Sequence, residues 1–261
     1  MRLITFLMLS ILVSCNKSDI QSSLLQSNSS TERVPTSPKK GFGLPESRLG
    51  AVHLDTLGAS WYYNWGPTTA ISTTKPFIPM CFSLNTLPRL TQYGTLLGFN
   101  EPDNASQSNI TVTNALVNWP VLVSKSTRIG SPATAGNPLT TGSWLQQFMS
   151  TNPKVDFICV HWYKGVNSTL FINDMTAIIN KWRKPIWITE FAPQTTSSST
   201  SSPNKYTQAQ VNTFITTVVR WMESQPMVEK YAWHDSKTGT SALFTSTGQL
   251  TTTGIAYRDA R

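Results

Sequence analysis

Residues 97–102 read LGFNEP and residues 185–192 read PIWITEFA. In each segment a run of bulky apolar residues leads directly into a glutamate, Glu101 in the first and Glu190 in the second. An apolar run bounded by glycine or proline is typical of a parallel strand buried on both faces, so each glutamate is expected at the C-terminal end of a strand. In a β/α barrel, that end of the strands carries the active site. The two segments therefore predict a barrel whose C-terminal face presents two carboxylates.

Two carboxylates offered to one cleft from different strands are suited to glycoside hydrolysis. One protonates the leaving oxygen, and the other attacks the anomeric carbon or activates water. A single glutamate at a strand end more often forms an ordinary ion pair, so only the two glutamates together indicate catalysis. Asn100 is placed to hold a sugar hydroxyl beside Glu101, while Pro102 turns the chain after it. These residues predict a glycoside hydrolase with Glu101 and Glu190 as its catalytic residues.

The rest of the chain repeats the pattern of apolar strand candidates separated by segments of helix length. This alternation predicts a parallel sheet, and eight strands are the number that a closed (β/α)8 TIM barrel requires. An open doubly wound sheet is disfavoured, because no glycine-rich phosphate loop follows an early strand. We expect one catalytic domain over residues 40–261. The predicted strands are Lys40–Leu44, Gly58–Trp65, Pro76–Phe82, Thr95–Glu101, Arg128–Ala133, Asp156–Tyr163, Pro185–Phe191 and Lys230–His234.

Composition narrows the possible partners. With 261 residues, 39% of them hydrophobic, the chain can bury one large core, and we expect a monomer. The net charge is +8, but the 21 lysines and arginines are scattered, so no nucleic-acid partner is expected. A low charged fraction of 13% and nine tryptophans suit binding of a neutral sugar.

The N-terminus carries an export signal. Arg2 precedes an apolar run over residues 3–13, which is too short to span a bilayer and typical of a signal peptide. Residues 12–15 read LVSC and resemble the bacterial lipobox, in which the cysteine is lipidated; the alternative is an ordinary signal peptide that contains a cysteine. Residues 16–39 are rich in serine, glutamine and asparagine and predict a flexible tether. We expect an exported protein that meets the membrane only through lipid on Cys15 at the bacterial cell envelope, or otherwise a secreted one.

The remaining cysteines and the histidines indicate no metal site. Cys81 and Cys159 lie in apolar runs, where a free cysteine is a common core residue. The three histidines are far apart in the sequence, and none has a metal-ligand spacing to a cysteine. No metal, cofactor or disulfide framework is therefore expected.

Several motifs occur in the order found in one known family. They are WYYNWGP (61–67), GFNEPD (98–103), VDFI (155–158) followed by HWY (161–163), and PIWITEF (185–191). The chain resembles glycoside hydrolase family 128, whose members act on β-1,3-glucans, and the likeness extends from Lys40 to Tyr257. The resemblance implies an endo-acting, retaining β-1,3-glucanase that binds a β-glucan polysaccharide or oligosaccharide. In this reading Glu190 is the nucleophile, Glu101 is the acid/base, and Asn100 bonds the sugar 2-hydroxyl.

Other side chains are expected to bind the sugar. Side chains alternate along a strand, so His161 and Tyr163 point to the same side, and we assign that side to the cleft. Tyr163 is expected to orient the Glu190 carboxylate and His161 to bond a sugar hydroxyl. Trp233 matches the place where barrels of this kind keep a platform beneath the reacting sugar.

Aromatic residues of the second predicted strand are further candidates, because an indole face covers the C–H face of a pyranose. Trp61, Tyr62 and Tyr63 belong to this group; Trp233 is the strongest of all these candidates, and Asn64 and Trp65 at the end of the second strand come next. Two alternatives stay open: a barrel that binds carbohydrate without turnover, and a glycosidase for another β-glycan linkage.

Overall fold

A computed structural model describes residues 36–193, 205–234 and 239–261. The predicted signal peptide, Cys15 and the tether as far as residue 35 lie outside the described residues. Within the described part of the chain, no helix has both the length and the apolar character needed to cross a membrane.

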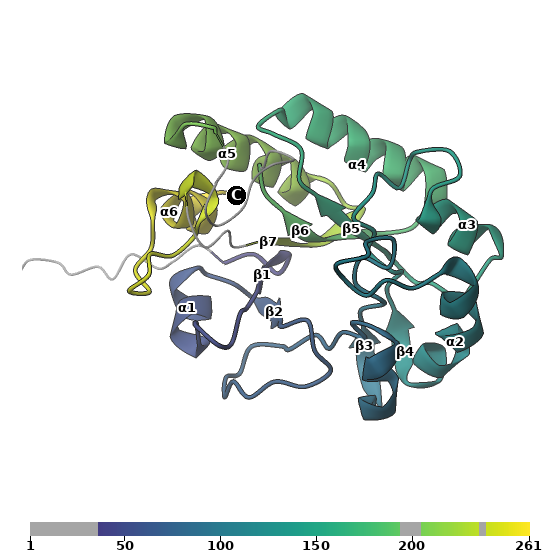
Figure 1. The fold of residues 1–261 in the computed structure, drawn as a ribbon. Coiled ribbons are helices and arrows are strands. Elements are labelled where there is room, and N and C mark those ends of the chain that lie inside the picture. The colour runs from purple at the N-terminus through teal and green to yellow at the C-terminus, as the bar shows by residue number, and fades with distance from the viewer. Residues whose placement is uncertain (1–35, 194–204, 235–238) are drawn as a thin grey trace, which may run out of the picture. The chain divides into compact units, whose positions relative to one another are not determined.

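The described residues form an α/β fold with parallel strands, as the sequence predicts (Figure 1). Five strands make one sheet in the order β2-β1-β7-β6-β5, and β3 and β4 pair separately. Every paired neighbour is parallel, so the carboxyl ends of paired strands lie at one edge. The strands are β1 (Lys40–Gly43), β2 (Trp61–Tyr63), β3 (Tyr93–Leu96), β4 (Ser126–Ile129), β5 (Ile158–Trp162), β6 (Ile186–Phe191) and β7 (Val228–Trp233).

The predicted third strand, Pro76–Phe82, is not a regular strand in the structure. It makes only isolated parallel bridges, from Phe77 to Tyr62 and from Met80 to Leu97. Pro76 and Pro79 have no N–H group to donate to a ladder, which explains why regular pairing fails here. The eight predicted strands are therefore seven strands in two sheets, in the described part of the chain.

Two further isolated bridges lie near these strands. Asn100 pairs with Ala133 beyond the ends of β3 and β4 and so extends their own sheet, whereas Gly130 pairs with Phe157, directly before β5, and joins that sheet to the five-stranded one. These bridges carry the segment that ends in Glu101 alongside the strands that carry the other predicted site residues.

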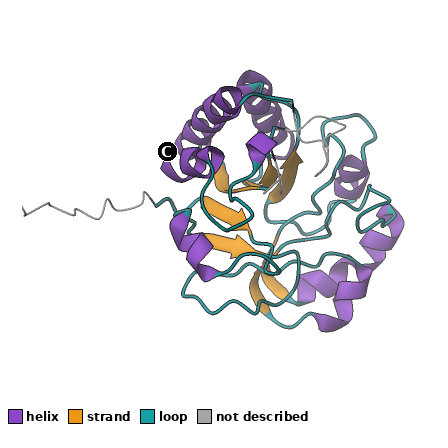
Figure 2. Ribbon diagram, turned by 60° about the vertical axis from the view of Figure 1, so that its left-hand side comes forward, coloured by secondary structure: helices purple, strands orange, loops and turns teal. Residues whose placement is uncertain are grey.

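Helices lie around the strands (Figure 2). Several begin at a residue whose side chain accepts a backbone N–H, which satisfies a donor that the first helical turn leaves unpaired. These caps are Thr111, Asn167, Thr207 and Thr251. The helices are α1 (Ala51–Thr56), α2 (Val112–Ser124), α3 (Trp144–Ser150), α4 (Ser168–Trp182), α5 (Gln208–Ser224) and α6 (Thr252–Asp259), with 3-10 turns η1 (Leu84–Arg89) and η2 (Gly239–Ser241).

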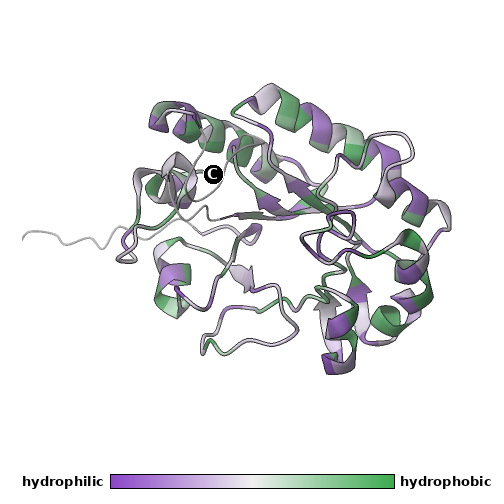
Figure 3. Ribbon diagram, viewed as in Figure 1, coloured by the Kyte–Doolittle hydropathy of each residue, from purple (hydrophilic) through white to green (hydrophobic). Residues whose placement is uncertain are grey.

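Alternating side chains of the strands enter two separate apolar clusters. The larger cluster lies between strands and helices, and it includes Trp162 of β5 and Trp233 of β7 together with the apolar residues of α4 and α5. These helices alternate between hydrophobic and hydrophilic residues (Figure 3). The smaller cluster contains the strand residues of opposite parity, including Cys159 and Ala232. This alternation fixes which residues at the strand ends can reach the active site.

Two neighbouring lysines tie β1 to the last helices. The Lys39 ammonium group donates to three carbonyls at the end of α5, and that of Lys40 donates to three carbonyls around the end of α6, at 2.7–2.8 Å. A cation is favourable at a helix C-terminus, where unpaired carbonyls gather. Burial lowers the pKa of Lys40 to about 8. Lys39, predicted as the last residue of the tether, therefore belongs to the folded domain.

Candidate active site

Glu101 lies beyond the end of β3, in a turn that determines its direction. Its backbone N–H donates to the carbonyl of Ala133 at 2.7 Å, and its φ of 42° lies in the left-handed region. That conformation costs an L residue about 1–2 kcal/mol, so the surrounding hydrogen bonds must hold it in place. The Asn104 side chain contributes by donating to Oε2 of Glu101 at 3.1 Å. Glu101 is thereby presented from a constrained turn.

Glu190 lies near the C-terminal end of β6 and is 5% exposed. Its Oε1 accepts the indole N–H of Trp65 at 2.7 Å and a longer bond from the Tyr63 hydroxyl at 3.4 Å. Its Oε2 accepts a short hydrogen bond from the Tyr163 hydroxyl. Each carboxylate oxygen thus has at least one donor, an arrangement that stabilises the ionised form.

The electrostatic surroundings of Glu190 favour its charge. Burial alone would raise its pKa, but the attraction of His161 and His234 and the hydrogen bonds from Tyr163 and Trp65 outweigh it, and the pKa is lowered. Burial together with the nearby Glu190 charge raises the pKa of the Tyr163 hydroxyl, so this group stays a donor. The site therefore holds one carboxylate ionised while keeping it out of water.

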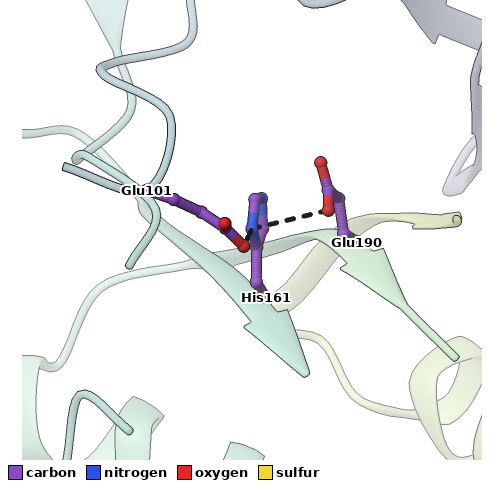
Figure 4. Close-up of side chains that lie close together, drawn as sticks. All are labelled: Glu101, His161 and Glu190. Carbon is purple, nitrogen blue, oxygen red and sulfur yellow. Dashed lines mark hydrogen bonds and ion pairs between the residues drawn. The ribbon is translucent and has the colours of Figure 1, made fainter. Parts of the chain in front are cut away.

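His161 lies between the two carboxylates (Figure 4). Its Nδ1 is 2.9 Å from Oε1 of Glu101 and 3.6 Å from Oε2 of Glu190, and its side chain is fully buried. Burial would lower the pKa of His161, but the charge of Glu190 and the hydrogen bond and charge of Glu101 raise it overall. The three groups form one coupled unit.

One ligand atom from each of Glu101, His161 and Glu190 lies within 4.8 Å of the others. This spacing would also admit a metal ion among the described residues. The contact between His161 and Glu101, however, already has the length of a direct hydrogen bond, which accounts for their approach. The chemistry available to the unit is proton transfer and nucleophilic attack by a carboxylate.

A cleft of about 470 Å³ opens over the two glutamates. Its walls combine aromatic faces with polar groups, the combination that sugar binding requires. The lining residues are Pro45, Arg48, Trp65, Phe82, Asn100, Glu101, Gln107, Tyr163, Glu190 and His234.

Known proteins are similar to this chain in sequence and fold. The family model described as the glycosyl hydrolase catalytic core matches residues 47–257. A GH128 subgroup I endo-β-1,3-glucanase from Amycolatopsis mediterranei, solved in complex with laminaripentaose, is 31% identical over 86% of this chain and 100% of its own, with a TM-score of 0.75. The chain belongs to glycoside hydrolase family 128.

Other relatives differ in what their names state. A GH128 subgroup VII oligosaccharide-binding protein from Trichoderma gamsii is 26% identical over 87% of this chain and 95% of its own, with a TM-score of 0.71. Alkali-sensitive linkage protein 1 of Schizosaccharomyces pombe is 28% identical over 241 residues, or 85% of this chain. The chain spans 44% of the length of that curated relative.

The structure brings several predicted GH128 site residues to the cleft. Trp65 and Tyr163 line it and hydrogen bond to Glu190. Asn100 also lines the cleft; its side-chain nitrogen donates to Gln107 at 3.3 Å, while its Oδ1 is buried and has no hydrogen-bond partner among the residues that the structure describes. That oxygen is positioned as an acceptor for a ligand hydroxyl.

Two predicted substrate contacts have different positions from those expected. His161 was predicted to bond a sugar hydroxyl, but its ring is fully buried and its Nδ1 contacts Glu101. Asn64 does not line the cleft; it donates to Glu46 and to the carbonyl of Thr68 and accepts from the N–H of Gly66. Asn64 thus uses its polar atoms within the protein, whereas Nε2 of His161 is buried and has no hydrogen-bond partner among the described residues.

Trp233 is not a platform at the cleft surface. Its ring is fully buried, packs edge to face against Phe191 and donates its indole N–H to the carbonyl of Ser241 at 2.8 Å. Ala232 points into the smaller cluster, so the neighbouring Trp233 must point the other way, toward the helices. No face of the indole is open to a sugar ring.

Sequence reasoning missed several residues of the cleft. His234 follows directly after the end of β7, and its Nδ1 lies 3.7 Å from Oε2 of Glu190. The sequence could have indicated this position, because side chains alternate along a strand and His234 therefore points to the face opposite that of Trp233. Gln107, Phe82 and Arg48 lie in connecting segments whose direction no local pattern reveals.

Proposed function

We propose that this protein is a retaining endo-β-1,3-glucanase in which Glu190 is the nucleophile and Glu101 the acid/base. The observation that carries the proposal is the close approach of the two carboxylates, with oxygen atoms within 4.8 Å. Retaining glycosidases place their carboxyl groups about 5–5.5 Å apart, whereas inverting enzymes need about 6.5–9.5 Å to admit a water. The lowered pKa of Glu190 supports its role as the group that attacks while ionised.

The reaction proceeds in two displacements. A Glu190 oxygen bonds to the anomeric carbon while the glycosidic C–O bond breaks, and Glu101 gives its proton to the leaving oxygen. Glu101 then takes a proton from water as the water oxygen bonds to the anomeric carbon and the bond to Glu190 breaks. Tyr163 and Trp65 hold Glu190 in place for the first step, and the contact with His161 holds Glu101.

The linkage and the endo action are supported by a relative. The Amycolatopsis mediterranei protein is called an endo-β-1,3-glucanase, and its complex contains laminaripentaose. The unpaired Oδ1 of Asn100 supports sugar binding beside Glu101, since a hydroxyl donor is the partner that this buried acceptor lacks. A β-glucan oligosaccharide or polysaccharide is thus the proposed partner of the cleft.

The second candidate function is carbohydrate binding without turnover. The Trichoderma gamsii relative, named an oligosaccharide-binding protein, is the observation that favours it. The presence of both glutamates with donors on their oxygens favours the enzyme. We keep the enzyme as the proposal.

Three expectations from the sequence remain part of the proposal. The isolated bridges from Tyr62 to Phe77 and from Met80 to Leu97 support a ring of strands closed through residues 76–82. The apolar run before Cys15 supports export and lipid attachment, with the protein held at a bacterial envelope. A monomer is the proposed state.

Digestion of laminarin, with the products sized over time, tests the proposed function. An endo-acting enzyme releases a range of oligosaccharides from the start, whereas an exo-acting enzyme releases one short product. Glu190→Gln serves as the matched inactive control, because it keeps the size of the side chain. Binding of laminarin without cleavage by the wild-type protein would favour the second candidate.

A further inference from the structure

One wall of the cleft is made by two loops that follow neighbouring strands. Residues 44–49 follow β1 and contribute Pro45 and Arg48, while residues 64–70 follow β2 and contribute Trp65. Glu46 lies between the two cleft residues of the first loop, yet it does not line the cleft. Its side chain is turned toward the second loop.

Glu46 collects three donors from residues 64–70. Its Oε1 accepts from the side-chain nitrogen of Asn64 at 2.6 Å and from the hydroxyl of Thr69 at 2.5 Å. Its Oε2 accepts from the backbone N–H of Ala70 at 3.1 Å. A carboxylate accepts such bonds more strongly than a neutral group does, and three together fix the loop at both ends. Glu46 thus ties the loop after β1 to the loop after β2.

The fixed Asn64 side chain determines the backbone at Trp65. While its nitrogen is held by Glu46, its Oδ1 accepts the N–H of Gly66 at 2.9 Å, which closes a turn around the intervening residue. Trp65 in that turn has a φ of 62°. A left-handed backbone costs a bulky L residue about 1–2 kcal/mol, so the turn persists only because its surroundings hold it. The indole N–H of Trp65 then donates to Glu190 at 2.7 Å.

We propose that Glu46 is a positioning residue of the active site: by holding Asn64 it keeps Trp65 in its strained turn and its indole on the Glu190 carboxylate. The proposal deepens the proposed function, on which it rests for the meaning of Glu190 as nucleophile. Glu46 acts through Asn64 and Trp65 and makes no contact with substrate.

Several other groups also face Glu190, and the test must separate them from Trp65. Tyr63, Tyr163, His161 and His234 approach the carboxylate from β2, β5 and the end of β7, and Glu101 shares His161 with it. Arg48 lies on the cleft wall beside Pro45. If Glu46 acts on Glu190 through the Trp65 indole, substitution of Glu46 must have no further effect on activity once the indole is removed.

The experiment is a double-mutant cycle of Glu46→Gln and Trp65→Phe, measured as kcat and as the pH profile of kcat/KM on laminarin. Glutamine keeps the size of the side chain but replaces one acceptor oxygen with a donor, so it cannot serve all three donors of the loop. Glu46→Gln should lower kcat about tenfold through misplacement of the Glu190 carboxylate. It should also move the acid limb to higher pH, because a weakened indole bond favours the ionised carboxylate less. In the Trp65→Phe background, Glu46→Gln should change neither quantity further.

A matched control is Glu229→Gln. Glu229 is also a half-buried carboxylate with two hydrogen-bond donors, Arg128 and Trp187, but it lies near the start of β7, away from the cleft. This variant should lose stability without moving the acid limb. If Glu46→Gln behaves in the same way, losing melting temperature with normal kcat and a normal profile, Glu46 is only a structural residue. If the two substitutions instead act independently, so that the loss of kcat in the double variant equals the product of the two single losses, Glu46 does not act through Trp65.

Asn64→Asp provides a second variant if Glu46→Gln folds poorly. It replaces the donor to Glu46 with a second carboxylate oxygen, which is repelled by Glu46, and keeps the acceptor for Gly66, so a change in the same direction is expected. The fluorescence of Trp65, obtained as the difference between the signals of the protein and its Trp65→Phe variant, can be titrated with pH. Because the Trp65 indole donates to Glu190, this difference signal reports protonation of Glu190 without any substrate. An upward shift of this titration in Glu46→Gln supports the proposal even if laminarin is not cleaved, and an unmoved titration contradicts it whether or not the enzyme is active.

Discussion

The Tyr163 hydroxyl donates to Oε2 of Glu190, the oxygen opposite the one that accepts the indole of Trp65. The two donors come from the ends of different strands, and together they fix both the position of the carboxylate and its charge. Trp65 lines the cleft and is the residue through which Glu46 is proposed to act, so that proposal concerns the same Glu190 carboxylate.

Tyr163→Phe should lower kcat/KM about 10- to 100-fold, because a hydrogen bond to a charged group contributes about 1.5–3 kcal/mol. The lowered pKa of Glu190 also means that activity is lost as pH falls through that pKa. Without the Tyr163 donor the pKa rises, so the acid limb should move to higher pH. Tyr93→Phe is the control, since its hydroxyl donates to the carbonyl of Pro67 rather than to the site. Equal effects of the two variants would argue against a specific role for Tyr163.

His161→Gln should change how stability depends on pH. The pKa of His161 is raised in the folded protein, so its contribution to stability is fully present below the unfolded pKa of about 6.5 and is lost as pH rises through the folded pKa. The melting-temperature difference between wild type and variant should therefore be largest at about pH 5 and shrink toward about pH 9. His53→Gln, whose ring accepts the N–H of Gly50, is the control. A difference that grows with pH would contradict the raised pKa.

The sequence predicted much of this arrangement because strand ends can be read locally. The apolar run before Glu190 marked the end of β6, whereas β3 already ends at Leu96, before Glu101. The alternation of side chains placed His161 with Tyr163. The partner of His161 could not be predicted, since its contact with Glu101 joins residues 60 positions apart. The third predicted strand is not regular because prolines 76 and 79 have no N–H group for a ladder, although the apolar pattern there is that of a strand.

Trp233 illustrates a limit of a different kind. Its place near a strand end was correct, but its direction depends on which face of the strand packs against helices. Trp233→Ala should therefore lower stability by about 3–5 kcal/mol, as expected for loss of a fully buried tryptophan. Denaturant unfolding measures this change, and KM for laminarin should stay near the wild-type value in the folded fraction. Normal stability with a raised KM would instead support the predicted role of Trp233 as a platform beneath the sugar.

Cys15→Ser should release active enzyme from membranes. The lipid on Cys15 is the proposed anchor, and no helix in the described part of the chain is long and apolar enough to replace it. Fractionation of cells that express each form, followed by laminarin digestion, measures the distribution of the enzyme. If the variant stays with the membrane fraction as the wild type does, the anchor lies elsewhere.

Removal of each glutamate should give a different chemical rescue. Glu101→Ala should regain activity on an activated substrate when azide is added, because azide attacks the glycosyl enzyme in place of water activated by the base. Glu190→Ala with azide should give the glycosyl azide of inverted configuration. Product analysis by NMR separates the two outcomes, and an exchange of the products would exchange the two roles.

The configuration of the first-formed product tests the central claim most directly. Proton NMR of a laminari-oligosaccharide digest, recorded before mutarotation, should reveal the β-anomer at the new reducing end, because two displacements at one carbon restore its configuration. Initial formation of the α-anomer would contradict the assignment of Glu190 as nucleophile and Glu101 as acid/base.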